Sequence, residues 1–199
     1  MSDEMQRNEL ALFGGPPAVT ADGQDRWERI PVEAVKRRIG ELLDEGTISI
    51  ANGGGVIREF ENEFREMAGT KFALCMNSGT ATLHSAYVAA GVKPGAEVLL
   101  PSYTWHATVT PVLHCSATPV FCDIEPDTLV IDPADVERKV TRRTRAICVV
   151  HPWGNVVDMD PIMAVAEKHG LMVIEDASHA HGARYKGRPV GGIGHIGCF

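Results

Sequence analysis

The stretch that decides the fold is "RAICVVHPWGNVVDMDPIMAVAEKHGLMVIED", residues 145–176. Two short apolar runs, 145–150 and 171–176, flank a segment whose apolar residues recur with helical spacing over 160–170. Each run has the length of a buried strand, and the segment between them has the length of a crossover helix. We therefore predict a βαβ unit, in which the two strands are parallel members of one sheet.

The same alternation extends on both sides of this unit. We predict further strands at 71–76, 96–101, 118–124 and 195–199. Helical patterns lie between them at 80–91, 105–115 and 133–140, and a short hairpin with Gly187 in its turn is predicted at 183–192. Strands that alternate with helices indicate an α/β fold, with a mostly parallel sheet between two layers of helices.

The chain before Gly69 follows a different pattern. Residues 1–30 are rich in Gly and Pro, and we interpret them as an N-terminal arm, whereas 31–46 and 56–69 have amphipathic helical patterns. We therefore expect an arm at 1–30 and a large domain at 31–199. Because the chain stops within an apolar segment, we expect this domain to be incomplete at its C-terminal end.

Charge and composition argue against several classes of protein. The formal net charge of −7 argues against nucleic-acid binding, since phosphates need a basic surface. The N-terminus "MSDEMQRNEL" is acidic where a signal peptide is basic, and no apolar run has the length of a membrane span. The five cysteines form no C-x-x-C pair, which is typical of a reducing compartment. We expect a cytoplasmic protein without nucleic-acid or membrane partners.

The residues just after the predicted strands are candidates for a ligand site, because ligands of parallel sheets collect at the carboxyl ends of the strands. Gly79 and Thr80 begin a helix after the strand at 71–76, and free amides at a helix N-terminus bind anions. Taken alone, this feature is explained better by a plain Ser or Thr N-cap. Trp105 follows the strand at 96–101, where its ring serves either for stacking on a cofactor or for the core.

The strand at 171–176 ends in Asp176, and a buried carboxylate there needs a cation, a metal or a protonated heterocycle as partner. His179 and His181 follow as an H-x-H pair, but a metal site is the weaker interpretation, because no known ligand motif accompanies them. An anion site, a flat ring and an acid together indicate a pocket for a flat, phosphorylated, basic heterocycle. Pyridoxal phosphate has this shape.

Several stretches resemble those of one family: "NSGTATLHSA" (77–86), "PGAEVLLPSYTWHATVTPV" (94–112) and "VIEDASHAHGARYKGRPVGGIGHIGCF" (173–199). They are similar to the DegT/DnrJ/EryC1/StrS sugar aminotransferases, and the resemblance runs from about residue 30 to residue 199. It implies the large domain of a fold-type I, aspartate-aminotransferase-like enzyme that depends on pyridoxal phosphate, with pyridoxamine phosphate as the intermediate form.

The resemblance also implies roles for individual residues. Gly79 and Thr80 would hold the cofactor phosphate, Trp105 would stack on the pyridine ring, and Asp176 would pair with the protonated ring nitrogen. His179 would lie near the 3-oxygen of the cofactor.

Two neighbouring side chains have no direct role in the family pattern. His181 is expected to make a structural hydrogen bond, and Glu175 is not expected to be catalytic. The lysine that forms the Schiff base is expected just beyond Phe199, so no catalytic residue is assigned within the chain. We expect the 199 residues to be inactive alone, without this lysine and the small C-terminal domain.

The implied activity is transfer of an amino group from glutamate or glutamine to a nucleotide-linked keto sugar or a cyclitol-type ketone, in amino-sugar or secondary-metabolite biosynthesis by a homodimer. Two alternatives stay open. One is a sugar dehydratase of the same family, which uses pyridoxamine phosphate and has histidine in place of the lysine. The other is a binding or regulatory protein that keeps the fold without the chemistry.

Overall fold

The computed structural model describes residues 15–16, 30–46 and 53–199 of the chain. The predicted arm at 1–30 therefore lies outside the described residues, except for positions 15, 16 and 30. The chain divides into two compact units, Met1–Ser49 and Ile50–Phe199, and each is described by itself. None of the described helices has the length and apolar character needed to cross a membrane.

The described part of the first unit contains the helix α2 (Val32–Asp44), close to the predicted 31–46. Pro31 precedes the first turn, where a missing amide hydrogen costs nothing, and Gly46 takes a left-handed conformation (φ +68°) after the last turn. Within this unit, the apolar side chains of Val35, Ile39 and Leu43 remain exposed.

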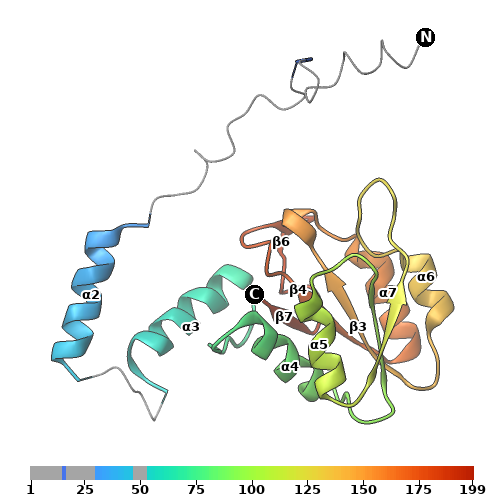
Figure 1. The fold of residues 1–199 in the computed structure, drawn as a ribbon, viewed down its shortest axis with the longest axis horizontal. Helices are drawn as coiled ribbons and strands as arrows, with labels where there is room; N and C mark the ends of the chain where they lie inside the picture. The colour runs from blue at the N-terminus through green and yellow to red at the C-terminus, as the bar shows by residue number, and fades with distance from the viewer. Residues whose placement is uncertain (1–14, 17–29, 47–52) are drawn as a thin grey trace. The chain divides into compact units, whose positions relative to one another are not determined.

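A five-stranded, all-parallel sheet forms the centre of the second unit (Figure 1). Its strands are β1 (Glu97–Pro101), β2 (Thr118–Cys122), β3 (Thr144–Val150), β4 (Met172–Asp176) and β7 (Ile196–Cys198). They lie in the order β2-β1-β3-β4-β7, so the βαβ unit predicted at 145–176 forms the neighbouring strands β3 and β4.

Helices cover both faces of this sheet, so the predicted three layers are confirmed. They are α4 (Gly79–Ala89), α5 (His106–His114), α6 (Pro133–Lys139) and α7 (Met159–His169), and α3 (Gly55–Ala68) precedes them in the chain. Successive strand residues point to opposite faces. Leu99, Ile147 and Val173 join one core with Val136 of α6 and Ile162 of α7.

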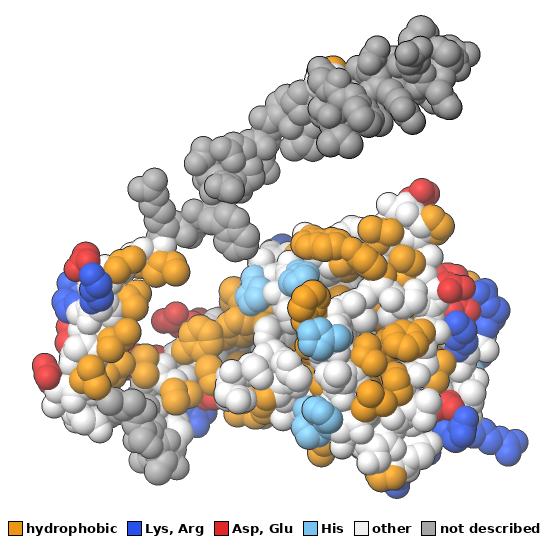
Figure 2. Space-filling model, viewed as in Figure 1, with side chains coloured by type: hydrophobic (Ala, Val, Ile, Leu, Met, Phe, Trp, Pro, Cys, Tyr) orange, Lys and Arg blue, Asp and Glu red, His pale blue; other side chains and the backbone are white. Residues whose placement is uncertain are grey.

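The opposite face of the sheet has its own core, in which Leu100, Cys148 and Ile174 pack with Leu83 of α4 and Val112 of α5. These five side chains are almost fully buried. Figure 2 shows that Lys, Arg, Asp and Glu side chains of this domain gather at its margin, whereas histidine and apolar side chains share the face turned to the viewer.

The predicted hairpin is also present, as β5 (Arg184–Tyr185) and β6 (Arg188–Pro189). Lys186 (φ +49°) and Gly187 (φ +81°) form its two-residue turn. Positive φ at both central positions is the geometry that matches the twist of a tight hairpin.

The strand predicted at 71–76 is wrong. The segment has no ladder partner among the described residues, and Phe72 and Leu74 are exposed by 74% and 73%. Its polar contacts are made to helices and to itself: the Thr70 hydroxyl donates to the Phe72 carbonyl (2.9 Å), and the Cys75 amide donates to Glu61 of α3 (3.0 Å). An apolar, strand-like run becomes a strand only where a second backbone pairs with it.

Candidate active site

The carboxyl ends of β1, β3 and β4 meet at one edge of the sheet. Leu99 lies beside Ile147, and Val150 lies beside Asp176, so the loops that follow these strands are neighbours. They enclose a cavity of about 440 Å³ together with the first turn of α4. The cavity is lined by all five residues predicted for the cofactor site: Gly79, Thr80, Trp105, Asp176 and His179.

Asp176 ends β4 and is 6% exposed. The Thr108 hydroxyl donates to its Oδ2 (2.7 Å), and the Ser178 hydroxyl (2.7 Å) and amide (3.3 Å) donate to its Oδ1. Within the described part of the chain, no Lys or Arg side chain forms an ion pair with this carboxylate. A buried carboxylate that has neutral donors alone is suited to a cation supplied by a ligand.

Thr108 is fully buried in α5 and was missed in the sequence analysis, as was Ser178. The Thr108 carbonyl accepts from the Tyr87 hydroxyl of α4 (2.9 Å), and its own hydroxyl lies 2.7 Å from that of Thr104. Helices α4 and α5 therefore both hold the donor that contacts Asp176.

The groups behind Asp176 are neutral at neutral pH. Burial raises the pKa of the Tyr87 phenol well above its ordinary value, and burial raises the pKa of the Cys198 thiol to about 12. Cys148, which is buried in the same core, has its pKa raised well above its ordinary value for the same reason. None of the three adds a charge beside the carboxylate.

The first turn of α4 forms another wall of the cavity. Ser78 is the N-cap, and its hydroxyl accepts from the Ala81 amide (3.2 Å), so the plain N-cap interpretation describes this residue correctly. The amides of Gly79 and Thr80 lie in the turn whose N–H groups have no acceptor within the helix. Gly79 and Thr80 line the cavity, where these amides and the helix dipole favour an anion.

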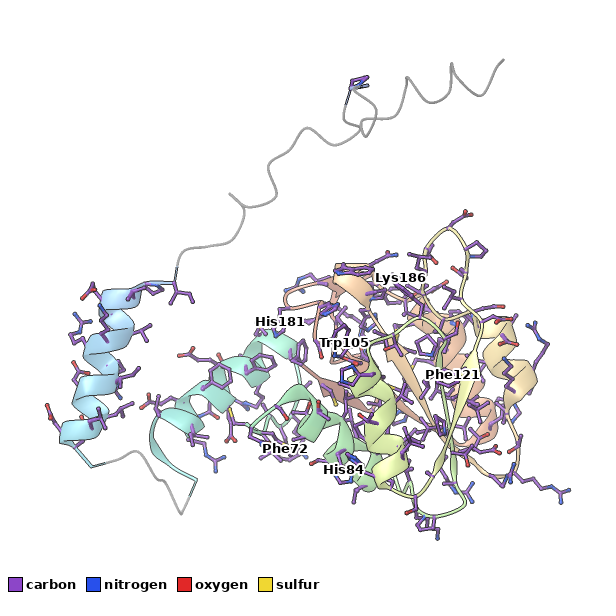
Figure 3. The ribbon with its side chains drawn as sticks, viewed as in Figure 1. Phe72, His84, Trp105, Phe121, His181 and Lys186 are labelled. Carbon is purple, nitrogen blue, oxygen red and sulfur yellow. The ribbon has the colours of Figure 1, made fainter. Side chains whose placement is uncertain are left out.

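Trp105 precedes α5 and is 68% exposed, so the alternative that it is a core residue is wrong (Figure 3). Its ring lies 5.0 Å from that of His106 and lines the cavity. Extended backbone at this position (φ −74°, ψ 146°) places the residue between the strand and the helix.

The two histidines of the H-x-H pair separate. His179 lines the cavity and stacks on Trp153, with ring centroids 6.2 Å apart and planes 24° apart. His181 instead packs against Phe64 and Phe199, at 6.4 Å and 5.3 Å between centroids, and among the described residues its side chain makes ring contacts where a structural hydrogen bond was predicted. In the part of the chain that the structure describes, no cluster of three or more His, Cys, Asp or Glu side chains could hold a metal ion.

Glu175 lies on the other face of β4 from Asp176 and is fully buried. It accepts hydrogen bonds from the amides of Gly191 (2.8 Å), Ile193 (2.8 Å) and Gly194 (2.6 Å), and from His151 (3.3 Å). Burial by itself raises the pKa of Glu175, but these hydrogen bonds outweigh burial and hold the pKa below its usual value. Glu175 thus ties the loop before β7 to the sheet.

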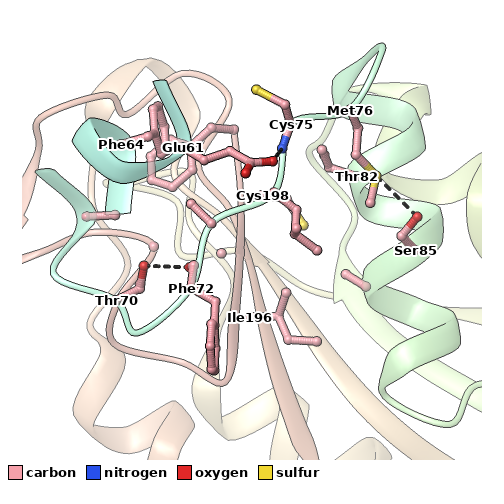
Figure 4. Close-up of a pocket in the computed structure, with 18 of the residues that line it drawn as sticks. Glu61, Phe64, Thr70, Phe72, Cys75, Met76, Thr82, Ser85, Ile196 and Cys198 are labelled. Atoms are coloured by element: carbon pink, nitrogen blue, oxygen red, sulfur yellow. Dashed lines mark hydrogen bonds between the residues drawn. The ribbon is translucent and has the colours of Figure 1, made fainter. Parts of the chain in front are cut away.

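A second, larger cavity of about 810 Å³ is lined by residues of α3, the segment 70–78 and β7 (Figure 4). Phe72, Leu74 and Ile196 are among its apolar lining residues, whereas Asp176 and Trp105 are absent from it. Size alone does not identify a site. We place the candidate site in the smaller cavity, where a carboxylate, a helix N-terminus and a flat ring converge.

The model of the DegT/DnrJ/EryC1/StrS aminotransferase family matches residues 32–199. The chain belongs to this family. The match covers every described element from α2 to β7, and it confirms the family that the sequence resembles.

Relatives within the family act on sugars and cyclitols according to their names. The chain is 46% identical to GDP-perosamine synthase of Caulobacter vibrioides over 159 residues, which are 80% of this chain and 42% of that protein. It is 39% identical over 196 residues to L-glutamine:scyllo-inosose aminotransferase of Streptomyces griseus, covering 96% of this chain and 46% of that protein.

The comparison with solved structures agrees with this family assignment. NtdA of Bacillus subtilis, solved with bound cofactor PMP, matches with a TM-score of 0.75 and 31% identity, covering 80% of this chain and 36% of NtdA. The chain thus spans less than half the length of each of these family members.

Proposed function

We propose that this chain carries the pyridoxal phosphate site of an aminotransferase. The reaction moves an amino group from glutamate or glutamine to a nucleotide-linked keto sugar or a cyclitol-type ketone, and the active form is a homodimer. One observation carries the proposal: Asp176, the N-terminus of α4 and Trp105 line a single cavity of about 440 Å³. The names of the family relatives support the two acceptor classes.

The lining residues fit the cofactor in charge and shape. The amides of Gly79 and Thr80 would hold its phosphate, and Trp105 would stack on its ring. Asp176 would accept a charge-assisted hydrogen bond from the ring N–H and so keep that nitrogen protonated. His179 would lie beside the 3-oxygen. When bound, the cofactor supplies an electron sink for the carbanion that forms next to the transferred amino group.

The surrounding residues would prepare this arrangement before the ligand arrives. Thr108 and Ser178 hold the two oxygens of Asp176 in fixed directions, so the carboxylate needs little reorganisation on binding. Burial behind Asp176 keeps water away from the hydrogen bond and strengthens it.

Pyridoxamine phosphate is the sharpest probe of the site, because it binds without a covalent bond and no lysine is among the residues lining this cavity. Quenching of tryptophan fluorescence would measure its affinity. We expect Asp176→Asn to weaken binding about 10–100-fold, the cost of one charge-assisted hydrogen bond. Asp160→Asn, which removes an exposed carboxylate paired with Lys186 outside this cavity, is the matched control.

Amino transfer is then assayed in the protein that contains this chain, with glutamate or glutamine as donor and scyllo-inosose or a nucleotide-linked keto sugar as acceptor. We expect Asp176→Ala to abolish the reaction. Normal turnover by that variant, or failure of the unmodified chain to bind pyridoxamine phosphate, would show that the site is assigned wrongly.

A further inference from the structure

The turn after β3 presents a large aromatic side chain that the proposed cofactor site does not use. Trp153 is 70% exposed, although it is one of the residues that line the cavity of Asp176. Its backbone is in the left-handed region (φ 49°, ψ 28°), which is unfavourable for a residue with a Cβ atom. Such a conformation persists where the surroundings enforce it, and it occurs preferentially at ligand sites.

Buried contacts on one side enforce this conformation. His151 is fully buried, and its Nδ1 accepts the Val157 amide (3.1 Å), so its Nε2 carries the proton and donates to Glu175 (3.3 Å). On the other side, the Asn155 side chain donates to the Thr128 carbonyl (2.6 Å). The turn is therefore anchored before and after Trp153, and the position of the indole is set by the fold.

The neighbours of the indole form a flat wall at the cavity. Its ring stacks on His179 (6.2 Å, 24°) and lies 5.7 Å from the ring of Tyr103, and all three residues line the cavity. Among the described residues that line this cavity, Asp176 is the only Asp, Glu, Lys or Arg. An aromatic surface suits the C–H face of a ring and does not suit a phosphate group.

We propose that Trp153 is a specificity-determining residue for the amino acceptor, and that its indole packs against the C–H face of the sugar or cyclitol ring. This inference rests on the proposed function. Saturated six-membered rings with equatorial hydroxyls expose such apolar faces, and an exposed indole gains by being covered. Stacking on the cofactor ring is the role proposed for Trp105.

The test compares Trp153→Asn with Trp153→Phe in the protein that contains this chain. Asn tolerates left-handed backbone, so this variant removes the ring and keeps the turn. We expect Trp153→Asn to raise KM for the acceptor roughly tenfold or more, as for other lost apolar contacts in substrate pockets. Trp153→Phe restores part of the affinity, and the rise in KM for the acceptor exceeds any change in KM for the amino donor or in the affinity for pyridoxamine phosphate.

Phe121→Ala is the matched control, because this aromatic residue of β2 is also exposed (48%) and lines neither cavity (Figure 3). It should leave KM for the acceptor unchanged. If the unmodified protein aminates neither acceptor class, the proposed function fails. If it does so and Trp153→Asn keeps the same acceptor KM, the role of Trp153 alone is refuted. Loss of the dimer in Trp153→Asn would likewise overturn it, since the indole would then belong to a subunit interface.

Discussion

Glu175 and Asp176 are adjacent carboxylates at the end of β4, yet they face different surroundings. Glu175 has three backbone amides and His151 as donors, and none of its surface reaches solvent or the candidate cavity. Asp176 has two hydroxyls and one long amide contact, and it lines the cavity. Donors of the protein fill the hydrogen-bonding capacity of Glu175, whereas Asp176 can still accept a hydrogen bond from a ligand.

This difference follows from the alternation of side chains along a strand. Period-two geometry turns consecutive residues to opposite faces, so one carboxylate meets the loop before β7 and the other meets α5. A pair of acids at a strand end therefore does not imply shared chemistry. The donors around each acid distinguish a structural role from a binding role.

The largest effect is expected from Glu175→Ala. Three backbone amides, two of them buried, and His151 would lose their acceptor, and we expect the free energy of unfolding to fall by about 3–5 kcal/mol. Urea unfolding followed by circular dichroism would measure it. Asp176→Ala is the matched control, with an expected loss of about 1 kcal/mol, because the freed hydroxyls can turn to water in the cavity. Equal losses for the two variants would remove the contrast between the carboxylates.

A smaller effect, on the affinity for pyridoxamine phosphate, is expected from Thr108→Val. The change keeps the volume of the side chain but removes the hydroxyl that donates to Asp176. We expect the dissociation constant for pyridoxamine phosphate to rise about 3–10-fold, as for one lost neutral hydrogen bond. Thr108→Ser keeps the hydroxyl and should bind nearly as the unmodified chain does. If the Val and Ser variants bind equally well, Thr108 does not position the carboxylate.

The smallest effect concerns pH and sharpens the role of Glu175. Its pKa is lower in the folded chain than in the unfolded chain. The stability it contributes is thus fully present above the unfolded pKa, about 4.3, and is lost as the pH falls through the folded value. The difference in unfolding free energy between the unmodified chain and Glu175→Gln should therefore shrink between pH 7 and acidic pH. A difference that stays constant with pH would contradict this account.

The sequence alone was sufficient to predict the three-layer fold and the family. The alternation of apolar runs with helical patterns predicted the parallel sheet, because buried parallel strands are continuous apolar runs and their crossovers are amphipathic. It failed at 71–76, where the apolar pattern was present but no partner backbone lies beside it among the described residues. Periodicity records which side chains are apolar, and it holds no information about hydrogen bonding to a distant strand.

The candidate site was predictable in part for a similar reason. Asp176 ends β4 and Trp105 follows β1, and topology brings such positions to one edge of the sheet. Gly79 was placed after a strand at 71–76 that is not formed, and it lines the cavity as the first residue of α4. Thr108 and Ser178 contact Asp176 through hydroxyls, and hydroxyls are too common in sequences to mark a site. The exposure of Trp105 also required coordinates, since the same residue type serves in cores and in pockets.

By itself, the sequence determined the order and type of the elements and the positions at which chemistry is possible, because these depend on local patterns along the chain. The resemblance had already indicated Asp176 and His179 for the site, and not Glu175 and His181. Only the tertiary structure decided which donors hold each of the two acids, and that Trp153 stands beside the cavity in a strained turn. Those outcomes depend on donors and rings brought together from distant segments, and such contacts form only when the sheet and its helices pack.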